Sequence, residues 1–334
     1  MRNLVTGGTG FLGSHLIEAL VARGELVQAL VRPGSDNRLL ERPGVERVTG
    51  DLGDPASMSA AVAGVDRVYH CAALASDWGS WAAFEAANVE GVRNLLDACL
   101  VTHIEKFIHI STTDVYGHPD HTANEQSPFR LRGWPYGDTK IRGEKLVWDY
   151  HCRYGLPVTV IRPAAIYGPR SPTFVSEIVS LLQKGEMVHI GTGKKPAGLG
   201  YVSNVVDLVL LAADAEAGLG QAYNASDDSV VSWRTYVNRL ADMLGARHPR
   251  ITVPYRIAYP LGWAMEGSYR LLKINHRPLL TRMAVELFAT NQSFPVEKAR
   301  NELGYRPRVD FDEGLERVEA WLRETEVITR RYGS

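Results

Sequence analysis

The chain contains 334 residues, a length that favours two lobes over one small compact domain. With 45% hydrophobic and 22% charged residues, it has the composition of an ordinary globular protein. A formal net charge of −1 excludes an overall basic surface of the kind that binds nucleic acid or anionic membranes. We therefore expect no nucleic-acid partner.

Cysteine usage and the start of the chain bear on its compartment. Cys71, Cys99 and Cys152 are scattered through apolar segments and form a poor disulfide framework. The first residues lead directly into a strand without a secretory signal, and no apolar run reaches the roughly 18 residues of a membrane span. These features predict a cytoplasmic protein without a transmembrane segment. No Cys/His cluster has metal-ligand spacing, so we expect no metal site.

A glycine-rich stretch at residues 7–13 follows the first apolar strand, which includes Leu4 and Val5. It opens a helix whose apolar residues, at positions 12, 16, 17 and 20, have helical spacing. Glycines at 8, 10 and 13 match G-x-G-x-x-G, in which the backbone turns tightly and approaches a pyrophosphate. The free N–H groups at the start of the helix bind the phosphates. The sequence therefore predicts a dinucleotide site here.

The end of the second strand, residues 26–31, indicates which dinucleotide binds. An NAD site usually carries an acid about 20 residues beyond the glycines, where it accepts a hydrogen bond from the ribose 2′-hydroxyl. This chain has Arg32 instead, with Ser35 and Arg38 close behind. An arginine pairs with a 2′-phosphate rather than with a hydroxyl. The pattern favours NADP(H) and leaves NAD(H) as the alternative.

Strands expected at residues 45–48, 68–71 and 105–110 alternate with helices, including a long one at 81–100. This alternation is typical of a parallel sheet with helices on both faces. Asp51, after the third strand, is placed to accept a hydrogen bond from the adenine, although an ordinary turn aspartate explains it nearly as well. The small residues Ala72 and Ala73 let the backbone pass close to the cofactor.

Tyr136 and Lys140 follow Pro135, a residue typical of the first turn of a helix. Their i, i+4 spacing places them on one helix face about 6 Å apart. Because a neighbouring ammonium favours the phenolate, we expect Lys140 to lower the pKa of Tyr136. Thr112, just past the fifth strand, faces the same ligand crevice.

The chain resembles the extended short-chain dehydrogenase/reductases, which include nucleotide-sugar epimerases and 3β-hydroxysteroid dehydrogenases. The matching motifs lie at residues 6–13, 50–52, 88–91, 111–117, 136–140, 161–169 and 303–307. The resemblance implies that Tyr136 is the acid/base and that Lys140 orients the nicotinamide ribose. It places Thr112 at the family's Ser/Thr hydroxyl position, with Ser111 as a second candidate.

The resemblance also implies an α/β fold: a Rossmann-type doubly wound parallel sheet with a smaller, mostly helical C-terminal substrate-binding cap. We expect residues 1–165 and a returning segment at 197–220 in the dinucleotide-binding domain, and residues 166–196 and 221–334 in the cap. The candidate catalytic residues are Thr112, Tyr136, Lys140 and Ser111. The candidate cofactor-binding residues are Gly7, Gly8, Thr9, Gly10, Phe11, Leu12, Gly13, Arg32, Ser35, Arg38, Asp51, Leu52, Cys71, Ala72, Ala73, Asn88, Tyr136, Lys140, Pro163, Ala165 and Ile166.

Three functions compete. The first is an NADP(H)-dependent reductase or dehydrogenase acting on a hydrophobic ketone or secondary alcohol that is hydroxysteroid-, β-keto acid- or flavanonol-like. The second is a nucleotide-sugar epimerase or dehydratase with retained NAD, and the third is a non-enzymatic cofactor-binding protein. Thr112, Tyr136 and Lys140 argue against the third. Arg32 favours the first, as does Thr113, because the family's 4,6-dehydratases carry acids at both positions after the catalytic Thr and this chain has only Asp114.

Two features of the cap bear on the substrate, and two helices bear on assembly. The aromatic and apolar residues at 255–272, with Phe174 and Val175, line either a hydrophobic pocket or the core of the cap. Cationic residues keep the sugar alternative open: Arg170, Arg234, Arg256, Arg270, Arg277 and Arg282. By resemblance we expect a homodimer through helices at 81–100 and 136–154. Leu95, Leu96, Ile141 and Trp148 either serve that interface or face the sheet.

Overall fold

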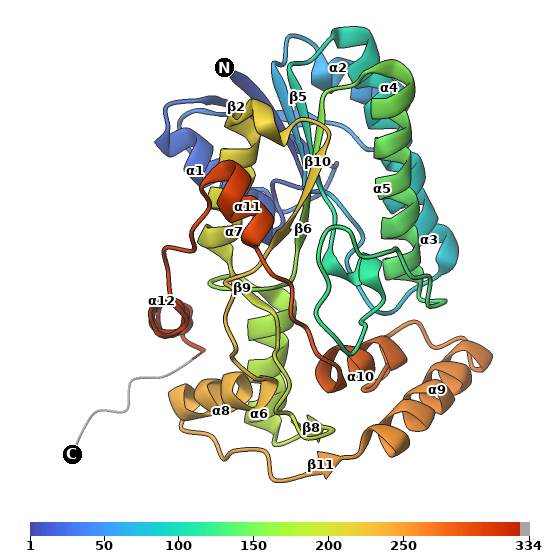
Figure 1. Ribbon diagram of the computed structural model, residues 1–334, viewed down its shortest axis with the longest axis vertical. Coiled ribbons are helices and arrows are strands. Elements are labelled where there is room, and N and C mark those ends of the chain that lie inside the picture. Colours follow the sequence, from blue (N-terminus) through green and yellow to red (C-terminus); the bar gives the residue numbers. More distant parts are fainter. Residues whose placement is uncertain (328–334) are drawn as a thin grey trace.

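A computed structural model describes residues 1–327 and is organised around a seven-stranded sheet in which every neighbouring pair is parallel (Figure 1). The strand order is β10-β6-β5-β4-β1-β2-β3. The strands are β1 (Arg2–Thr6), β2 (Leu26–Val31), β3 (Val45–Thr49), β4 (Arg67–His70), β5 (Lys106–Ile110), β6 (Val158–Pro163) and β10 (Gln221–Ala225). This topology confirms the doubly wound Rossmann-type sheet.

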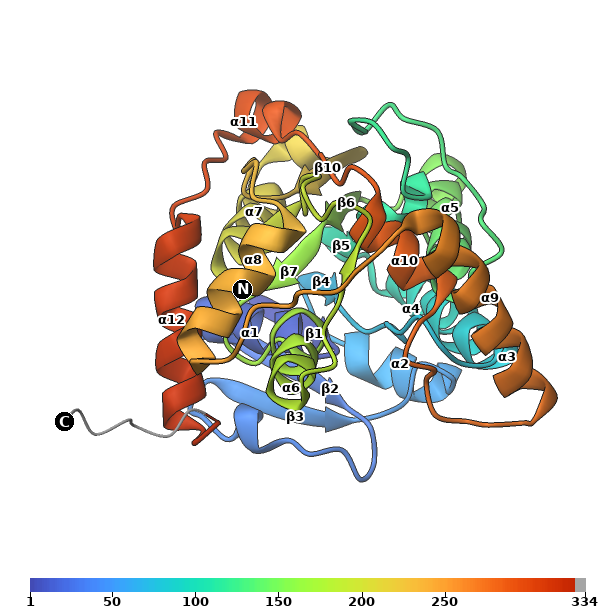
Figure 2. The same cartoon turned by 90° about the horizontal axis from the view of Figure 1, so that it is seen from below.

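Helices cover both faces of the sheet because successive strand residues point to opposite sides. Leu4 packs into the layer beneath α2 (Pro55–Val62), α4 (Gly91–Thr102) and α5 (Pro135–Tyr154). Val5 packs into the opposite layer, beneath α1 (Phe11–Ala22), α7 (Val202–Asp214) and α11 (Glu297–Leu303). Figure 2 shows α1 and α7 on one side of the strands and α4 and α5 on the other.

The predicted helix at 81–100 forms in three parts: α3 (Trp81–Glu85), the π-helical η2 (Ala86–Glu90) and α4. Asn88 lies in the π-helical part, and its carbonyl oxygen occupies the place that a Cβ on Gly143 of α5 would take. The π-helical turn therefore brings the backbone of this segment directly against the backbone of α5.

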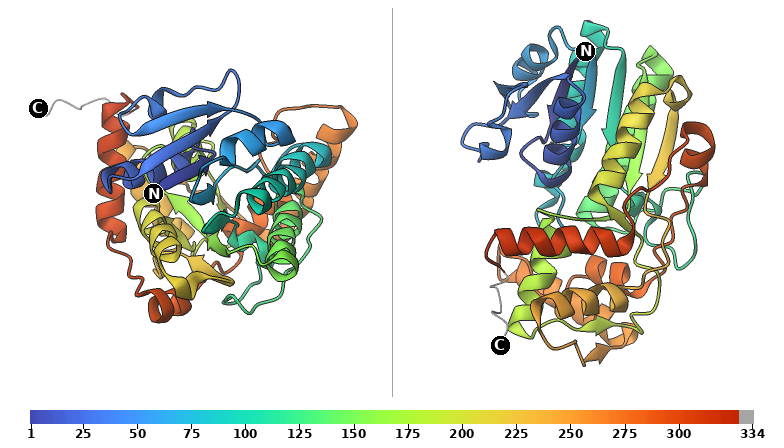
Figure 3. Two further views of the ribbon diagram at one scale, coloured as in Figure 1. Left: turned by 90° about the horizontal axis from the view of Figure 1, so that it is seen from above. Right: turned by 90° about the vertical axis from the view of Figure 1, so that its left-hand side faces the viewer.

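The second lobe is mostly helical, as expected, and has its own core. It contains α6 (Ile178–Lys184), α8 (Trp233–Leu244), α9 (Tyr255–Leu271), α10 (Arg282–Ala289) and α12 (Phe311–Glu324), with β7 (Ala165–Tyr167) paired to β9 (Leu199–Tyr201) and β8 (His189–Ile190) paired to β11 (Thr252–Val253). The remaining short helices are the 3-10 helices η1 (Arg38–Leu40), η3 (Thr113–Tyr116) and η5 (Glu216–Gly218) and the π-helical η4 (Pro172–Glu177). In the right-hand view of Figure 3, α12 lies across the junction between the sheet and this helical lobe.

The returning part of the nucleotide domain is longer than the predicted 197–220. β10, at residues 221–225, forms the edge strand next to β6, and α11 packs against the same layer through Ala299. Tyr223 of β10 is fully buried in that layer, so these residues belong to the sheet core and not to the cap.

The aromatic segment at 255–272 forms α9, and most of its large side chains are exposed and lie outside the core. Leu261, Trp263, Leu271 and Leu272 are 49%, 64%, 83% and 67% exposed. The buried residues of α9 are Ala258, Gly262 and Glu266, whose i, i+4 spacing forms the inner face against α10. The helix is amphipathic, but its small residues face inward.

The side chains named for the dimer interface are engaged within the chain. Leu95 and Leu96 are 0% exposed beneath the sheet and Ile141 is 1% exposed, while Trp148 packs partly against the same core as Leu95. Leu95, Leu96 and Trp148 thus pack in the layer beneath the sheet, whereas Ile141 packs against Val115, Tyr116 and Phe294. Within residues 1–327, no helix is long and apolar enough to cross a membrane, and no cluster of His, Cys, Asp or Glu could hold a metal ion.

Candidate active site

The strand order reverses between β1 and β4, and ligands of open α/β sheets bind at this switch point, beyond the carboxyl ends of the strands. Thr6 ends β1, and its hydroxyl lies 2.8 Å from Nδ1 of His70 at the end of β4. The same hydroxyl accepts a hydrogen bond of 3.2 Å from the amide of Ala72. These contacts hold together the two strand ends that form the crevice.

The glycine-rich loop closes one side of the crevice. Gly7 has a φ of +69°, and a Cβ there would lie 2.7 Å from the amide nitrogen of Ala72. A Cβ on Gly13 would collide with the carbonyl oxygen of Gly7. α1 then starts at Phe11 with no side-chain cap and no acidic residue in its first turn, so its N-terminal dipole is open to a phosphate. The loop fits the pyrophosphate of a dinucleotide.

The residues predicted to bind the adenosine end of the cofactor follow strands β2 and β3. Arg32 is exposed and has no ion pair among residues 1–327, whereas Arg38 pairs with the adjacent Asp36 in the same exposed loop as Ser35. One oxygen of Asp51 accepts a 2.7 Å hydrogen bond from the amide of Gly53, as in an ordinary turn. Leu52, which follows, accepts a hydrogen bond from Asn94 through its carbonyl.

The structure brings Thr112 and Tyr136 together at the carboxyl end of β5. Thr112 is 7% exposed and lies close enough to Tyr136 to lower the pKa of the phenol, while its own hydroxyl donates a 3.2 Å hydrogen bond to Asp114. Burial has the larger, opposite effect, and the charge of Asp114 adds to it, so the pKa of Tyr136 is raised above its ordinary value.

The expectation that Lys140 lowers the pKa of Tyr136 was wrong for this structure. Lys140 is 3% exposed, and its ammonium donates a 2.7 Å hydrogen bond to the carbonyl of Ile110, the last residue of β5. Burial lowers the pKa of Lys140 to about 8, while the nearby Glu144 carboxylate opposes that shift. The i, i+4 spacing puts both residues on one helix face, but the ammonium is bonded to the strand end and not to the phenol.

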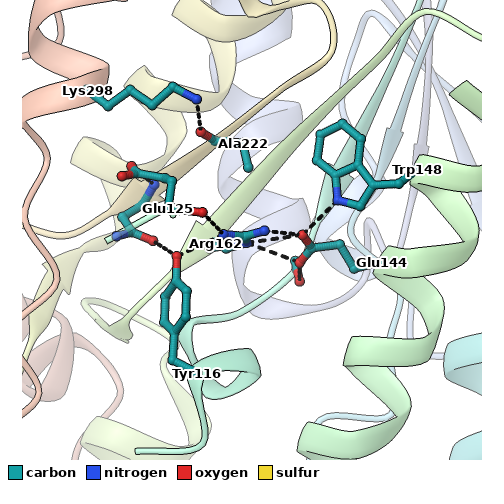
Figure 4. Close-up of polar contacts among 9 residues, drawn as sticks. Tyr116, Glu125, Glu144, Trp148, Arg162, Ala222 and Lys298 are labelled. Atoms are coloured by element: carbon teal, nitrogen blue, oxygen red, sulfur yellow. Dashed lines mark hydrogen bonds and ion pairs between the residues drawn. The ribbon is translucent and has the colours of Figure 1, made fainter. Parts of the chain in front are cut away.

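Ser111 has a different partner from Thr112. Its hydroxyl donates a 2.5 Å hydrogen bond to Glu144, which is completely buried in α5. Figure 4 shows Glu144 facing the guanidinium of Arg162, which also contacts Tyr116. Tyr116 in turn donates to Asn224 of β10 at 2.7 Å. Ser111 therefore belongs to a buried network beneath the site, and Thr112 is the hydroxyl that lies near Tyr136.

The other predicted cofactor residues lie in three places. Cys71, Ala72 and Ala73 follow β4 and are partly or well exposed at the crevice, while Pro163 ends β6 and Ala165 and Ile166 lie in β7. Asn88 is 2% exposed, and its side chain bonds both backbone groups of Leu74 and the hydroxyl of Thr139. Its amide therefore fixes the loop after β4 against α5.

Sequence reasoning missed two groups near the site. The carboxylate of Asp114 contacts both Thr112 and the buried His118. In the loop after β4, Asp77 binds Arg277 and Thr281 of the cap, and Trp78 packs edge-on against Tyr269 of α9. The i, i+4 spacing of Asp114 and His118 was the only sequence signal for the first group. The contacts of Asp77 join residues about two hundred positions apart and leave no local pattern.

Comparison with known proteins supports this geometry. A model of the NAD dependent epimerase/dehydratase family matches residues 3–226. A 2-alkyl-3-oxoalkanoate reductase of Stenotrophomonas maltophilia is 33% identical, covering 96% of this chain and 99% of that protein. The mouse (Mus musculus) sterol-4-alpha-carboxylate 3-dehydrogenase, decarboxylating, is 31% identical, covering 94% and 89%. Among solved structures, a UDP-glucose 4-epimerase of Thermotoga maritima with UDP-glucose has a TM-score of 0.80 at 25% identity, covering 98% and 100%.

Proposed function

The chain belongs to the NAD dependent epimerase/dehydratase family, the extended short-chain dehydrogenase/reductases, and on that premise we propose an NADP(H)-dependent reductase for a hydrophobic ketone. The observation that carries the proposal is that Thr112, at the carboxyl end of β5, lies close to Tyr136 on the first turn of α5, on the same edge of the sheet as the glycine loop. This arrangement supplies a proton and a hydrogen bond to one carbonyl oxygen.

The residues of the chain have separate roles in this reaction. Gly7 and Gly13 leave room for the pyrophosphate, and α1 presents its N-terminus to it. A bound nicotinamide cofactor supplies the hydride. Tyr136 gives its proton to the carbonyl oxygen, and Thr112 hydrogen-bonds the same oxygen. A raised pKa keeps Tyr136 protonated at neutral pH, the form that an acid for ketone reduction requires.

Arg32 supports NADPH as the reductant. It is exposed at the end of β2, where the adenosine ribose of a Rossmann ligand lies, and no carboxylate within residues 1–327 neutralises it. A free guanidinium binds a phosphate with two parallel hydrogen bonds and has nothing to offer a hydroxyl that must donate. NADH remains the alternative that the experiment below distinguishes.

The cap arginines argue against a nucleotide-sugar substrate, whose diphosphate needs free cations. Four of the six sequence candidates form ion pairs with carboxylates: Arg170 with Glu18, Arg277 with Asp77, and Arg270 and Arg282 with Glu266. Arg234 donates to the carbonyl of Thr192. The relatives named as reductases and dehydrogenases act on oxoalkanoates and sterols, so we propose a β-keto acid or a similar hydrophobic ketone as substrate.

The test compares substrates and cofactors on the purified chain. With a 2-alkyl-3-oxoalkanoate as probe, we expect a kcat of about 1–10³ s⁻¹, measured from the loss of NADPH absorbance. UDP-glucose incubated with the same chain should be recovered unchanged. Conversion of UDP-glucose without net cofactor oxidation would establish the epimerase alternative and overturn the proposal.

We also propose a homodimeric, cytoplasmic enzyme. The three free thiols, Cys71, Cys99 and Cys152, are consistent with a reducing compartment. The proposed interface comprises the outer faces of α4 and α5, through polar residues such as Arg93 and Arg142, since their apolar residues are used inside the chain. Light scattering at micromolar concentration tests it, and a monomer would contradict it.

A further inference from the structure

Helix α9 presents an outer face of exposed apolar side chains. Of the eighteen large hydrophobic side chains that are exposed within residues 1–327, eight lie between positions 251 and 279. On α9, the spacing of Ile257, Leu261 and Leu271 places them in one stripe that points away from the buried inner face. Figures 1 and 2 show α9 at the rim of the molecule with α10 on its inner side. An exposed apolar stripe of this kind marks a surface that binds a partner or a membrane.

The charges of this segment are almost all positive. Residues 255–279 contain four arginine or lysine side chains and one carboxylate, a net charge of +3, whereas the whole chain carries −1. The carboxylate belongs to Glu266, which is buried and bonded to Arg282 of α10. Arg256 and Lys273 are exposed at the two ends of the stripe, and their side chains form no ion pair within residues 1–327. The outer face therefore combines apolar surface with free cations.

Trp263 adds an amphipathic ring beside the stripe. Its spacing of seven residues from both Arg256 and Arg270 places the three side chains in one row along the helix. Tryptophan is enriched at the headgroup level of bilayers, where one part of the ring is apolar and the other is wet. α9 has 17 residues, fewer than the roughly 20 of a membrane span. These features are typical of a helix that lies along a membrane surface.

A second copy of this chain fits the outer face of α9 poorly. An isologous dimer places the same patch on both subunits, so Arg256 and Lys273 would meet a patch that carries cations and no exposed carboxylate. Like charges that face each other across an interface oppose binding. A bilayer with anionic lipids satisfies both properties of the face, because it offers phosphates to the cations and an acyl boundary to the stripe.

We propose that the outer face of α9 docks reversibly on the surface of a bilayer that contains anionic lipids. The stripe enters the boundary between headgroups and acyl chains, and Arg256 and Lys273 pair with lipid phosphates. The docked helix adjoins the crevice, because Trp78 of the loop after β4 packs edge-on against Tyr269 of α9. This inference goes beyond the proposed function, and its test requires no substrate.

The experiment measures flotation of the purified chain with two sets of vesicles. One set is pure phosphatidylcholine, and the other is phosphatidylcholine and phosphatidylglycerol in equal parts. We expect the wild type to float with the anionic set and to bind it more tightly than the neutral set. Added salt should weaken the binding to the anionic set, because it screens the attraction between the cations and the lipid phosphates.

A triple variant tests the apolar part of the face. Leu261→Ser with Trp263→Ser and Leu271→Ser should abolish flotation, while its urea midpoint stays at the wild-type value because all three side chains are exposed. The matched control replaces three exposed apolar residues on other elements, Leu26, Val101 and Val230, by Ser. The control should float like the wild type.

A double variant tests the cations. Arg256→Gln with Lys273→Gln should weaken binding to the anionic vesicles by about thirtyfold, since each cation near an anionic surface contributes about fivefold. Arg47→Gln with Arg306→Gln is its control, because it removes the same charge from exposed positions on β3 and between α11 and α12. This control should bind the anionic vesicles like the wild type.

Each other outcome contradicts the docking. Failure of the wild type to float, equal binding to both sets of vesicles, or flotation that survives the triple variant would overturn it. A dimer of the wild type that the triple variant converts to a monomer, without flotation of either, would assign the face to a second copy. None of these results depends on NADPH consumption, whose absence would contradict the proposed function alone.

Discussion

Replacing Arg162 by Met should destabilise the protein strongly, because it removes the only cation hydrogen-bonded to a buried carboxylate within residues 1–327 and leaves the Lys140 ammonium as the nearby positive charge. Glu144 is 0% exposed and Arg162 is 4% exposed. The guanidinium donates through Nε to both carboxylate oxygens, at 3.1 and 3.2 Å, and through its second nitrogen to one of them. After the substitution, only the neutral donors of Ser111 and Trp148 remain on Glu144.

Removing one partner of a buried ion pair costs about 3–5 kcal/mol. With an unfolding entropy of about 2.1 cal/mol/K per residue, the 334 residues give about 0.7 kcal/mol/K. Tm should therefore fall by about 4–7 °C, measured by circular dichroism and checked by urea unfolding.

Two further variants show whether the buried charge is the cause. The double variant Glu144→Leu with Arg162→Met should recover most of the loss, since an apolar pair of similar volume replaces a buried ion pair at little cost. Arg153→Met, on the same helix as Glu144, breaks the exposed pair with Asp149 and should cost under about 1 kcal/mol. A loss below about 1 kcal/mol in Arg162→Met, or a double variant no more stable than the single one, would refute the reasoning.

Three other predictions follow from the site and its surroundings. Tyr136→Phe should lower kcat by about 10²–10⁴-fold with NADPH binding retained by fluorescence titration, and a fully active variant would refute its role. Arg32→Asp should abolish an at least tenfold preference for NADPH over NADH, about 1.4 kcal/mol, whereas Arg47→Asp should preserve it, and equal wild-type affinities would count against the arginine. Burial raises the pKa of Asp227 to about 6, so its contribution to stability is present below the unfolded-state pKa and is lost as pH rises through 6. Asp227→Asn should flatten that dependence in urea unfolding between pH 4 and pH 6, by on the order of 3 kcal/mol, and an unchanged slope would exclude Asp227 as its source.

The parts of the site that were predicted from sequence are those encoded by local spacing. The glycines at 7–13 and the pair Tyr136 and Lys140 each lie within a few residues, where backbone geometry alone brings them together. The alternation of strands and helices likewise predicted the parallel sheet, because each βα unit buries its own apolar face.

Local spacing could not identify partners that come from distant segments. Ser111 and Thr112 are adjacent hydroxyls, and only the buried Glu144 on α5 distinguishes their roles. The hydrogen-bond partner of His118 is the side-chain oxygen of Gln292, 174 residues away. The direction in which Lys140 points was missed for the same reason, since its acceptor is a backbone carbonyl at the end of β5.

Apolar periodicity identified helices but not what covers them. Leu95 and Leu96 form an apolar stripe that could pack on a sheet or on a second chain, and the structure places them on the sheet. In α9 the inner face consists of Ala258, Gly262 and Glu266. Most of the large aromatic and apolar residues at 255–272, which were predicted to line a pocket or the core of the cap, are therefore on the exposed face. The i, i+4 spacing of Ala258, Gly262 and Glu266 was the signal for that inner face.

The most direct test of the account follows the hydride itself. The purified chain is incubated with NADPH carrying deuterium at the transferred position and with a 2-alkyl-3-oxoalkanoate, and the product is examined by mass spectrometry and NMR. The account predicts one deuterium on the carbinol carbon of the product for each NADPH oxidised, and none in the Tyr136→Phe variant beyond its residual rate. A product without deuterium at that carbon, or epimerised UDP-glucose with no net oxidation of the cofactor, would contradict it.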